Sequence, residues 1–146
     1  METLNTLIHE HLLLRGQLDY LEAFTLLDEE NKIEKLSRTL SNIKSIWDPH
    51  EEKEEKFFTK LSKSGIGIEI LNEKMLIEEH RQLRGHWEVL NKSLKTKDKN
   101  KIWTTLDTDG KMIIEKFRKH MEKEENSFRR IFLPSNPPID FNVSRD

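Results

Sequence analysis

Apolar residues recur along most of this chain in steps of three and four, the spacing that puts side chains on one face of an α-helix. Four such segments cover residues 4–21, 33–61, 76–94 and 103–131. Short polar stretches separate them at residues 28–32, 62–67 and 95–100, and a proline-rich sequence begins at Pro134. The pattern predicts four helices with one apolar stripe each, as in an all-α, up-down antiparallel four-helix bundle.

Two positions weaken this pattern within the helices. Pro49 lies inside the second segment, where we expect a kink or a restart of the helix, and Gly110 is a weak point in the fourth. We expect one domain over residues 1–133 and an irregular C-terminal tail over residues 134–146, because prolines at 134, 137 and 138 end the last helix.

Two phrases of the sequence occur twice. EHLLLRG at residues 10–16 returns as EHRQLRG at 79–85, and HEEKEEKFF at 50–58 returns as HMEKEENSF at 120–128. The offsets are 69 and 70 positions, and the order is kept. The chain therefore reads as two repeated helical hairpins, each with one motif on its first helix and the other on its second.

Six ionisable residues occupy stripe positions whose neighbours are Leu, Ile, Phe and Trp. They are His11, His50, Glu54, His80, His120 and Glu124. In each HxxxE pair the two side chains lie about 40° apart on one helix face. Burying a charge without a partner costs several kcal/mol, and no Lys or Arg shares the stripes of the second and fourth helices.

A metal would relieve this cost, because it binds neutral imidazole and ionised carboxylate together. Four histidines and two carboxylates are too many for one tetrahedral ion, but they suit two ions with carboxylates between them. Iron is favoured, and the ligand types also admit manganese or zinc. The alternative is a buried polar layer whose side chains hydrogen-bond to one another without a metal. The duplication disfavours this alternative.

Composition narrows the class of protein. The 146 residues contain no cysteine, which excludes disulfides, thiolate-held metals and cysteine nucleophiles. The net charge is −2 and no basic stripe is present, so we expect no nucleic-acid partner. Neither a signal peptide nor an apolar run of ~20 residues occurs, so we expect a cytoplasmic protein without a membrane partner.

The set EHLLLR, HEEKEEKFF, EHRQLR and HMEKEENSF, in that order, resembles the hemerythrin-like family, also called the HHE cation-binding domain. The resemblance covers roughly residues 3 to 133. It implies a non-haem di-iron centre, carboxylate-bridged and oxo- or hydroxo-bridged. By position, it implies that His11 and His50 hold one iron, His80 and His120 hold the other, and Glu54 and Glu124 bridge them. Glu51 is a candidate for an extra ligand, although the second repeat has Met121 there.

The sequence departs from the oxygen-carrying hemerythrins. Arg84 stands where they place a second histidine, and the last helix has glutamate four residues after its histidine instead of aspartate five after it. The chain thus resembles a branch with four histidines and two carboxylates, whose irons keep more open positions for oxygen, peroxide or nitric oxide.

Two functions fit this resemblance. The first is a binding protein for oxygen or a related small ligand, in storage, delivery or sensing. The second is a di-iron oxidoreductase acting on peroxide or nitric oxide, or an iron-donating repair protein. Whether the chain is an enzyme, and which redox partner it uses, the sequence leaves open.

The sequence assigns less specific roles to the residues that flank these six. Arg15 and Arg84 either neutralise a glutamate near the metal or form ordinary helix salt bridges. Glu10 and Glu79 could relay protons, but we favour solvated acids, and we assign the EEKEEK run to solvated surface.

The helical register makes a prediction about the remaining histidines. Changing His9 or His86 to Ala should leave the metal content unchanged, because they lie about 160° and about 120° away from His11 and His80 around their helices. Changing any stripe histidine to Ala should remove about half of the metal, or all of it if the bridge fails. Metal analysis of the purified variants checks this, and loss of metal in His86→Ala but not in His80→Ala would contradict the register.

Overall fold

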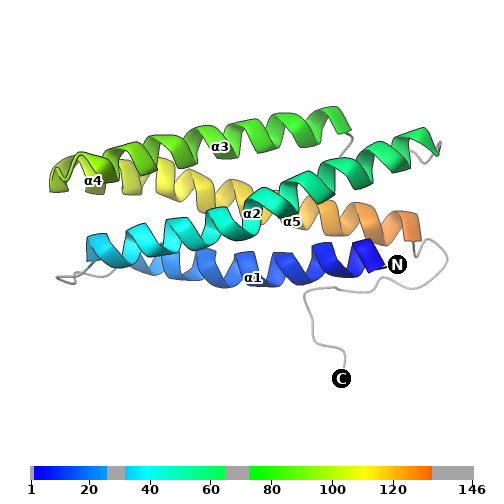
Figure 1. Cartoon of the computed structure of the whole chain (residues 1–146), viewed down its shortest axis with the longest axis horizontal. Coiled ribbons are helices and arrows are strands. Elements are labelled where there is room, and N and C mark those ends of the chain that lie inside the picture. The colour runs from blue at the N-terminus through cyan, green and yellow to red at the C-terminus, as the bar shows by residue number, and fades with distance from the viewer. Residues whose placement is uncertain (1, 26–31, 65–72, 133–146) are drawn as a thin grey trace, which may run out of the picture.

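The computed structural model describes residues 2–25, 32–64 and 73–132, and all of its regular structure is helical. Three long helices come first: α1 (Glu2–Phe24), α2 (Lys32–Lys63) and α3 (Glu73–Lys95). A fourth helical segment follows as α4 (Lys99–Thr105), a π-helical turn (Leu106–Gly110) and α5 (Lys111–Phe132). Figure 1 shows these four segments side by side as a bundle, which confirms the predicted all-α bundle. The predicted tail at 134–146 lies outside the described residues.

The helices begin and end close to the predicted breaks. Between α3 and α4 the chain turns at Lys97, whose φ of 59° is left-handed, and Asp98 caps α4 by accepting a hydrogen bond from the backbone N–H of Lys101. The helix does not restart at Pro49, because α2 is continuous across it. The weak point predicted at Gly110 coincides with the π-helical turn.

The apolar stripes meet in two separate cores. The large core includes Leu14, Leu83 and Phe117, and the small core consists of Leu7, Phe57, Phe58, Leu61, Leu76 and Phe128. On α1, His11 lies between Leu7 of the small core and Leu14 of the large one. The other helices repeat this order, so the polar stripe residues form a layer between two apolar regions.

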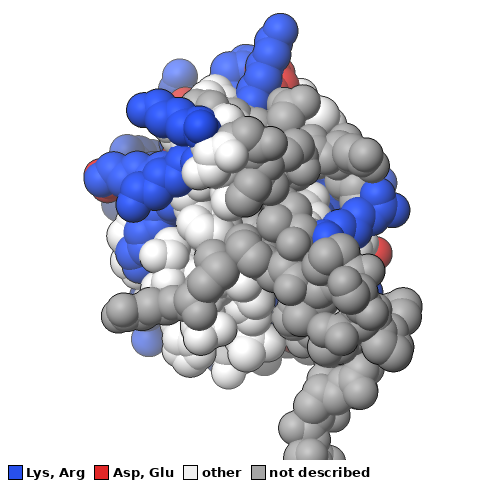
Figure 2. All heavy atoms as spheres, turned by 90° about the vertical axis from the view of Figure 1, so that its right-hand side faces the viewer, with Lys and Arg blue, Asp and Glu red and all other residues white. Residues whose placement is uncertain are grey.

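The end of the bundle nearest the small core is rich in basic side chains. The N-termini of α1 and α3 and the C-termini of α2 and α5 lie at this end, on the right of Figure 1. Figure 2 looks onto it and shows Lys and Arg around the rim. Lys60 and Lys63 in the last turn of α2, and Arg129 and Arg130 in that of α5, complement the negative ends of the helix dipoles. None of the described helices combines the length and apolar content of a membrane span.

Candidate metal centre

Six buried polar side chains meet in the layer between the two cores. Each is at most 3 % exposed, and together they come from all four segments of the bundle. We call them the inner set: His11 of α1, His50 and Glu54 of α2, His80 of α3, and His120 and Glu124 of α5. The structure therefore brings together all six residues that the sequence singled out.

Glu54 lies at the centre of the inner set and faces all four histidines. Its Oε2 is 2.6 Å from Nε2 of His50 and 3.7 Å from Nε2 of His11. Its Oε1 is 2.6 Å from Nε2 of His80 and 2.8 Å from Nε2 of His120. Each carboxylate oxygen therefore faces a different pair of histidines.

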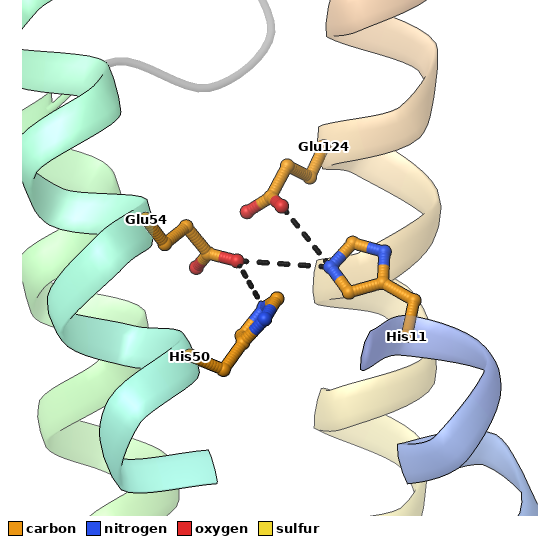
Figure 3. A group of neighbouring side chains, drawn as sticks. All are labelled: His11, His50, Glu54 and Glu124. Atoms are coloured by element: carbon orange, nitrogen blue, oxygen red, sulfur yellow. Dashed lines mark ion pairs between the residues drawn. The ribbon is translucent and has the colours of Figure 1, made fainter. Parts of the chain in front are cut away.

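Glu124 divides its two oxygens in the same way. Its Oε1 lies 3.1 Å from Nε2 of His11, and its Oε2 lies 3.4 Å from Nε2 of His120. Figure 3 shows Glu54 and Glu124 approaching from opposite sides, with the imidazoles of His11 and His50 directed between them. Two carboxylates thus span the space between the two histidine pairs.

Several inner atoms are buried without a hydrogen-bond partner. They are Nε2 of His11 and His50, Oε2 of Glu54 and both carboxylate oxygens of Glu124. Although Nε2 of His50 is only 2.6 Å from Oε2 of Glu54, the two atoms are not in hydrogen-bonding geometry. Unpaired buried lone pairs are costly, and a cation bound among them would satisfy the lone pairs that face it.

The donor atoms also fall into groups compact enough for a metal ion. One group combines His11, His50, Glu54 and Glu124, and a second combines Glu54, His80 and His120. In each group the ligand atoms lie within 4.8 Å of one another. Imidazole with carboxylate suits iron, manganese or zinc, so the residues present fit such ions.

The outward-facing nitrogen of each inner histidine is held by another glutamate. We call these four the outer carboxylates. The Nδ1 atoms pair as His11 with Glu125 at 2.6 Å, His50 with Glu10 at 2.9 Å, His80 with Glu55 at 2.8 Å and His120 with Glu79 at 2.7 Å. A carboxylate can only accept, so Nδ1 carries the proton and Nε2 faces the centre, as metal ligation requires.

Sequence reasoning missed the outer carboxylates. It favours solvated acids at Glu10 and Glu79, but these side chains are 14 % and 22 % exposed and bind histidines. It places Glu55 on the solvated surface of the EEKEEK run, although Glu55 pairs with His80, and Lys53 of the same run pairs with Glu10. The available signal was the duplication itself, because EH and HxxxEE place these acids at matching positions of both repeats.

Basic side chains hold most of the outer carboxylates in turn. Lys53 lies 2.6 Å from Glu10, and Lys123 lies 2.9 Å from Glu79 in the matching place of the other half. Arg15 lies 2.9 Å from Glu125, which is the metal-proximal role that the sequence left open for it. These cations offset the negative charge that the glutamates bring to the layer.

The correspondence between the two halves fails at Glu51. Arg84 donates a hydrogen bond to Oε1 of Glu51 and not to Glu55, and the second repeat has the buried Met121 in this place. Oε2 of Glu51 is buried without a hydrogen-bond partner, and a third compact group contains Glu51, Glu55 and His80. The His80 side of the layer thus has one more carboxylate than the His11 side.

The other two histidines lie away from the inner set. His9 is exposed on α1. The Nδ1 of His86 lies 2.8 Å from Asp109 in the π-helical turn. Their positions agree with the register expected from the sequence.

The carboxylates change the proton affinity of the layer. Burial alone would lower the pKa of His11 and His120, but the charges and close polar contacts of Glu124 and Glu54 outweigh it and raise both pKa values well above the usual 6.5. Burial alone would raise the pKa of Glu54, but the charge of His120 and close polar contacts with His11, His120 and His50 hold it well below 4.5. Without metal, protons on the histidines neutralise the buried carboxylates.

This proton binding predicts how metal-free protein responds to pH. The raised pKa of His11 and His120 stabilises the fold fully below the unfolded value of 6.5, and this stabilisation is lost as the pH rises toward and through the raised pKa values. The lowered pKa of Glu54 stabilises the fold above pH 4.5, and this stabilisation is lost as the pH falls toward the lowered pKa. Thermal unfolding of metal-free protein should therefore give the highest melting temperature between about pH 4.5 and 6.5 and a fall toward pH 9.

Bound metal should abolish the fall in melting temperature toward pH 9, because the cation replaces the protons that neutralise the buried carboxylates. The His9→Ala variant, changed at an exposed position, should follow the native profile. A metal-free melting temperature that stays level or rises between pH 6.5 and 9 would contradict the proton-binding account.

Comparison with known proteins agrees with this geometry. The sequence matches the family model described as the hemerythrin HHE cation-binding domain over residues 2–131, which includes the whole inner set. Separate searches of curated proteins and of solved structures gave no match. The family is named for cation binding, and the buried histidines and glutamates of this chain could hold such a cation. The chain belongs to the hemerythrin HHE cation-binding domain family.

Proposed function

We propose that the chain is a non-haem di-iron protein that binds oxygen or a related small ligand. In this proposal His11 and His50 hold one iron, His80 and His120 hold the second, and Glu54 and Glu124 bridge them. The observation that carries the proposal is the division of Glu54, whose two oxygens each lie 2.6 Å from a histidine of a different pair. A single metal ion held by one histidine pair would not need a carboxylate that also reaches the other pair.

The protein side chains prepare the site in two ways. The outer carboxylates fix the histidine tautomers and keep Nε2 free for ligation. The two apolar cores keep the layer dry, since Trp47 and Phe117 on one side and Phe58 and Phe128 on the other are at most 2 % exposed. A dry layer strengthens the attraction between the carboxylates and the cations.

The ligand set also leaves room for a small molecule. Two histidines with carboxylate oxygens are typical of non-haem ferrous sites that keep open positions. When bound, a pair of ferrous ions would supply these open positions and the electrons for chemistry with a small ligand.

Addition of oxygen to anaerobically reduced protein tests this function. A coloured adduct that persists and is reversed by removing oxygen is the outcome expected of a binding protein. Rapid conversion to the oxidised form, with consumption of added peroxide, would instead favour the oxidoreductase alternative and contradict reversible binding.

The bridging assignment predicts that the two metals are lost together. Changing Glu54 or Glu124 to Ala should reduce the metal content from about two ions per chain to well below one, because each carboxylate serves both positions. Metal analysis with the visible spectrum of the purified variants measures this. Glu52→Ala, at a glutamate that is 70 % exposed on α2, is the matched control and should keep both ions. Retention of one intact ion in Glu54→Ala would contradict the bridge.

A further inference from the structure

A surface groove between α3 and α5, which pack against each other (Figure 1), reaches down to an inner histidine. Its volume is about 320 Å³, and His120 and Glu79 are among the residues that line it. Glu79 is the outer carboxylate that lies 2.7 Å from Nδ1 of His120, and its side chain is 22 % exposed. The groove therefore connects the surface with the buried polar layer through one carboxylate side chain.

Three lysines of α5 line this groove: Lys116, Lys119 and Lys123. They follow one another in steps of three and four residues, so they lie within about 60° of one another around the helix and spread over about 10 Å along it. Lys116 donates a hydrogen bond to a neutral group, Oε1 of Gln82 at 2.8 Å, rather than to a carboxylate. One side of the groove is thus a row of ammonium groups.

The lining carries an excess of positive charge. Its carboxylates are Glu79 and Glu115, so with a neutral His120 the three lysines leave a net charge of one positive unit. Glu115 pairs with Lys119 at 3.1 Å, but the two side chains are 58 % and 67 % exposed, and surface pairs of this kind contribute only about 0–1 kcal/mol. Lys119 can therefore exchange this partner for a bound anion.

The other half of the bundle shows that the polar layer does not require these lysines. The layer contacts are repeated there, because Lys53 holds Glu10 and Glu10 holds His50. The groove residues are not repeated, since the positions of Gln82, Lys116 and Lys119 are taken in that half by Leu13, Ile46 and Pro49. The positive charge of the α3–α5 groove therefore needs an explanation of its own.

We propose that the α3–α5 groove binds a small oligocarboxylate, an organic acid with two or three carboxylate groups. Two of its carboxylates would pair with Lys116 and Lys119. The apolar side chains of Leu83 and Met112, which also line the groove, suit the carbon skeleton of an organic acid and not an inorganic anion. The volume is at the small end of the range for ligand pockets, roughly 300–1,000 Å³, so the acid is a small one.

The position of the groove gives the bound acid a role in iron supply, and this role rests on the proposed function. Three ammonium groups repel a free divalent cation, but they attract iron that arrives as an anionic complex with an oligocarboxylate. The ion then passes from the carboxylates of the acid to the polar layer. The freed acid leaves, and the protons that the histidines hold are released to solvent.

Calorimetric titration of the full, metal-free chain with citrate tests the groove without iron. The native chain should bind one citrate with a Kd on the order of 0.1 mM, and acetate at least about tenfold more weakly. The double change Lys116→Gln, Lys119→Gln should weaken citrate binding at least about tenfold, because it removes two of the ammonium groups. The double change Lys56→Gln, Lys111→Gln removes the same charge from two surface pairs outside the groove, and it is the control that should bind like the native chain.

A variant that fills the groove separates its shape from its charge. Gln82→Trp, at an exposed residue of the lining, leaves every charge in place and should still weaken citrate binding while the melting temperature stays unchanged. A native chain that does not bind citrate would overturn the proposal. Equal affinity for citrate, acetate and inorganic phosphate would also overturn it, because that result would show only screening of the lysines.

Iron uptake by the metal-free chain tests the role in supply. Iron offered as its citrate complex should enter the native chain at least about fivefold faster than the Lys116→Gln, Lys119→Gln variant, whereas ferrous sulfate should load both at the same rate. Analysis of the metal bound to protein after gel filtration measures this. Equal uptake from the citrate complex would overturn the supply role. A native chain that takes up iron from neither source would contradict the proposed function, and the citrate titration would still decide whether the groove binds the acid.

Discussion

The bundle depends on the neutralisation of Glu54 and Glu124 inside its core. Both carboxylates are fully buried, and the nearest groups are imidazoles, which are neutral unless protonated. Removing the partner of a buried charge costs about 3–5 kcal/mol, a large part of the stability of a domain of this size. The layer must therefore hold protons or metal cations. The same constraint explains why four histidines converge on one carboxylate, an arrangement that apolar packing alone would not produce.

Charge then alternates outward from this layer. Inner carboxylates face the histidines, the histidines face outer carboxylates, and Lys53, Lys123 and Arg15 hold three of those. Because each group is held by the next, the orientation of an imidazole is set by residues that reach the surface. The additional carboxylate Glu51, with Arg84, makes the surroundings of the two histidine pairs unequal. Two metal positions built from the same ligand types would therefore not be identical.

The sequence predicted the features that follow from position within one helix. The four helical segments and the six inner residues lie on regular three-four spacing, so each could be assigned to an inward face without knowing its neighbours. The outer carboxylates could not be found in this way, since the Glu10–His50 and Glu125–His11 pairs depend on how adjacent helices are rotated and spaced. The prediction that the helix restarts at Pro49 is wrong. Local propensity does not include the packing of Trp47 and His50, which are both buried on one continuous helix.

Comparison of the two repeats shows which sequence positions the buried polar layer requires and which it does not. Positions that face the layer are the same in α1 and α3, as Glu10 with His11 and Glu79 with His80 show. Outward positions differ, because nothing in the layer constrains them. Polar residues are the default for a helix face in water, and α3 has Arg81 and Gln82 at the positions of Leu12 and Leu13, although it exposes Met75, Ile77 and Val89 elsewhere. Exposed apolar side chains therefore occur on both helices, and the buried polar layer does not determine where they lie.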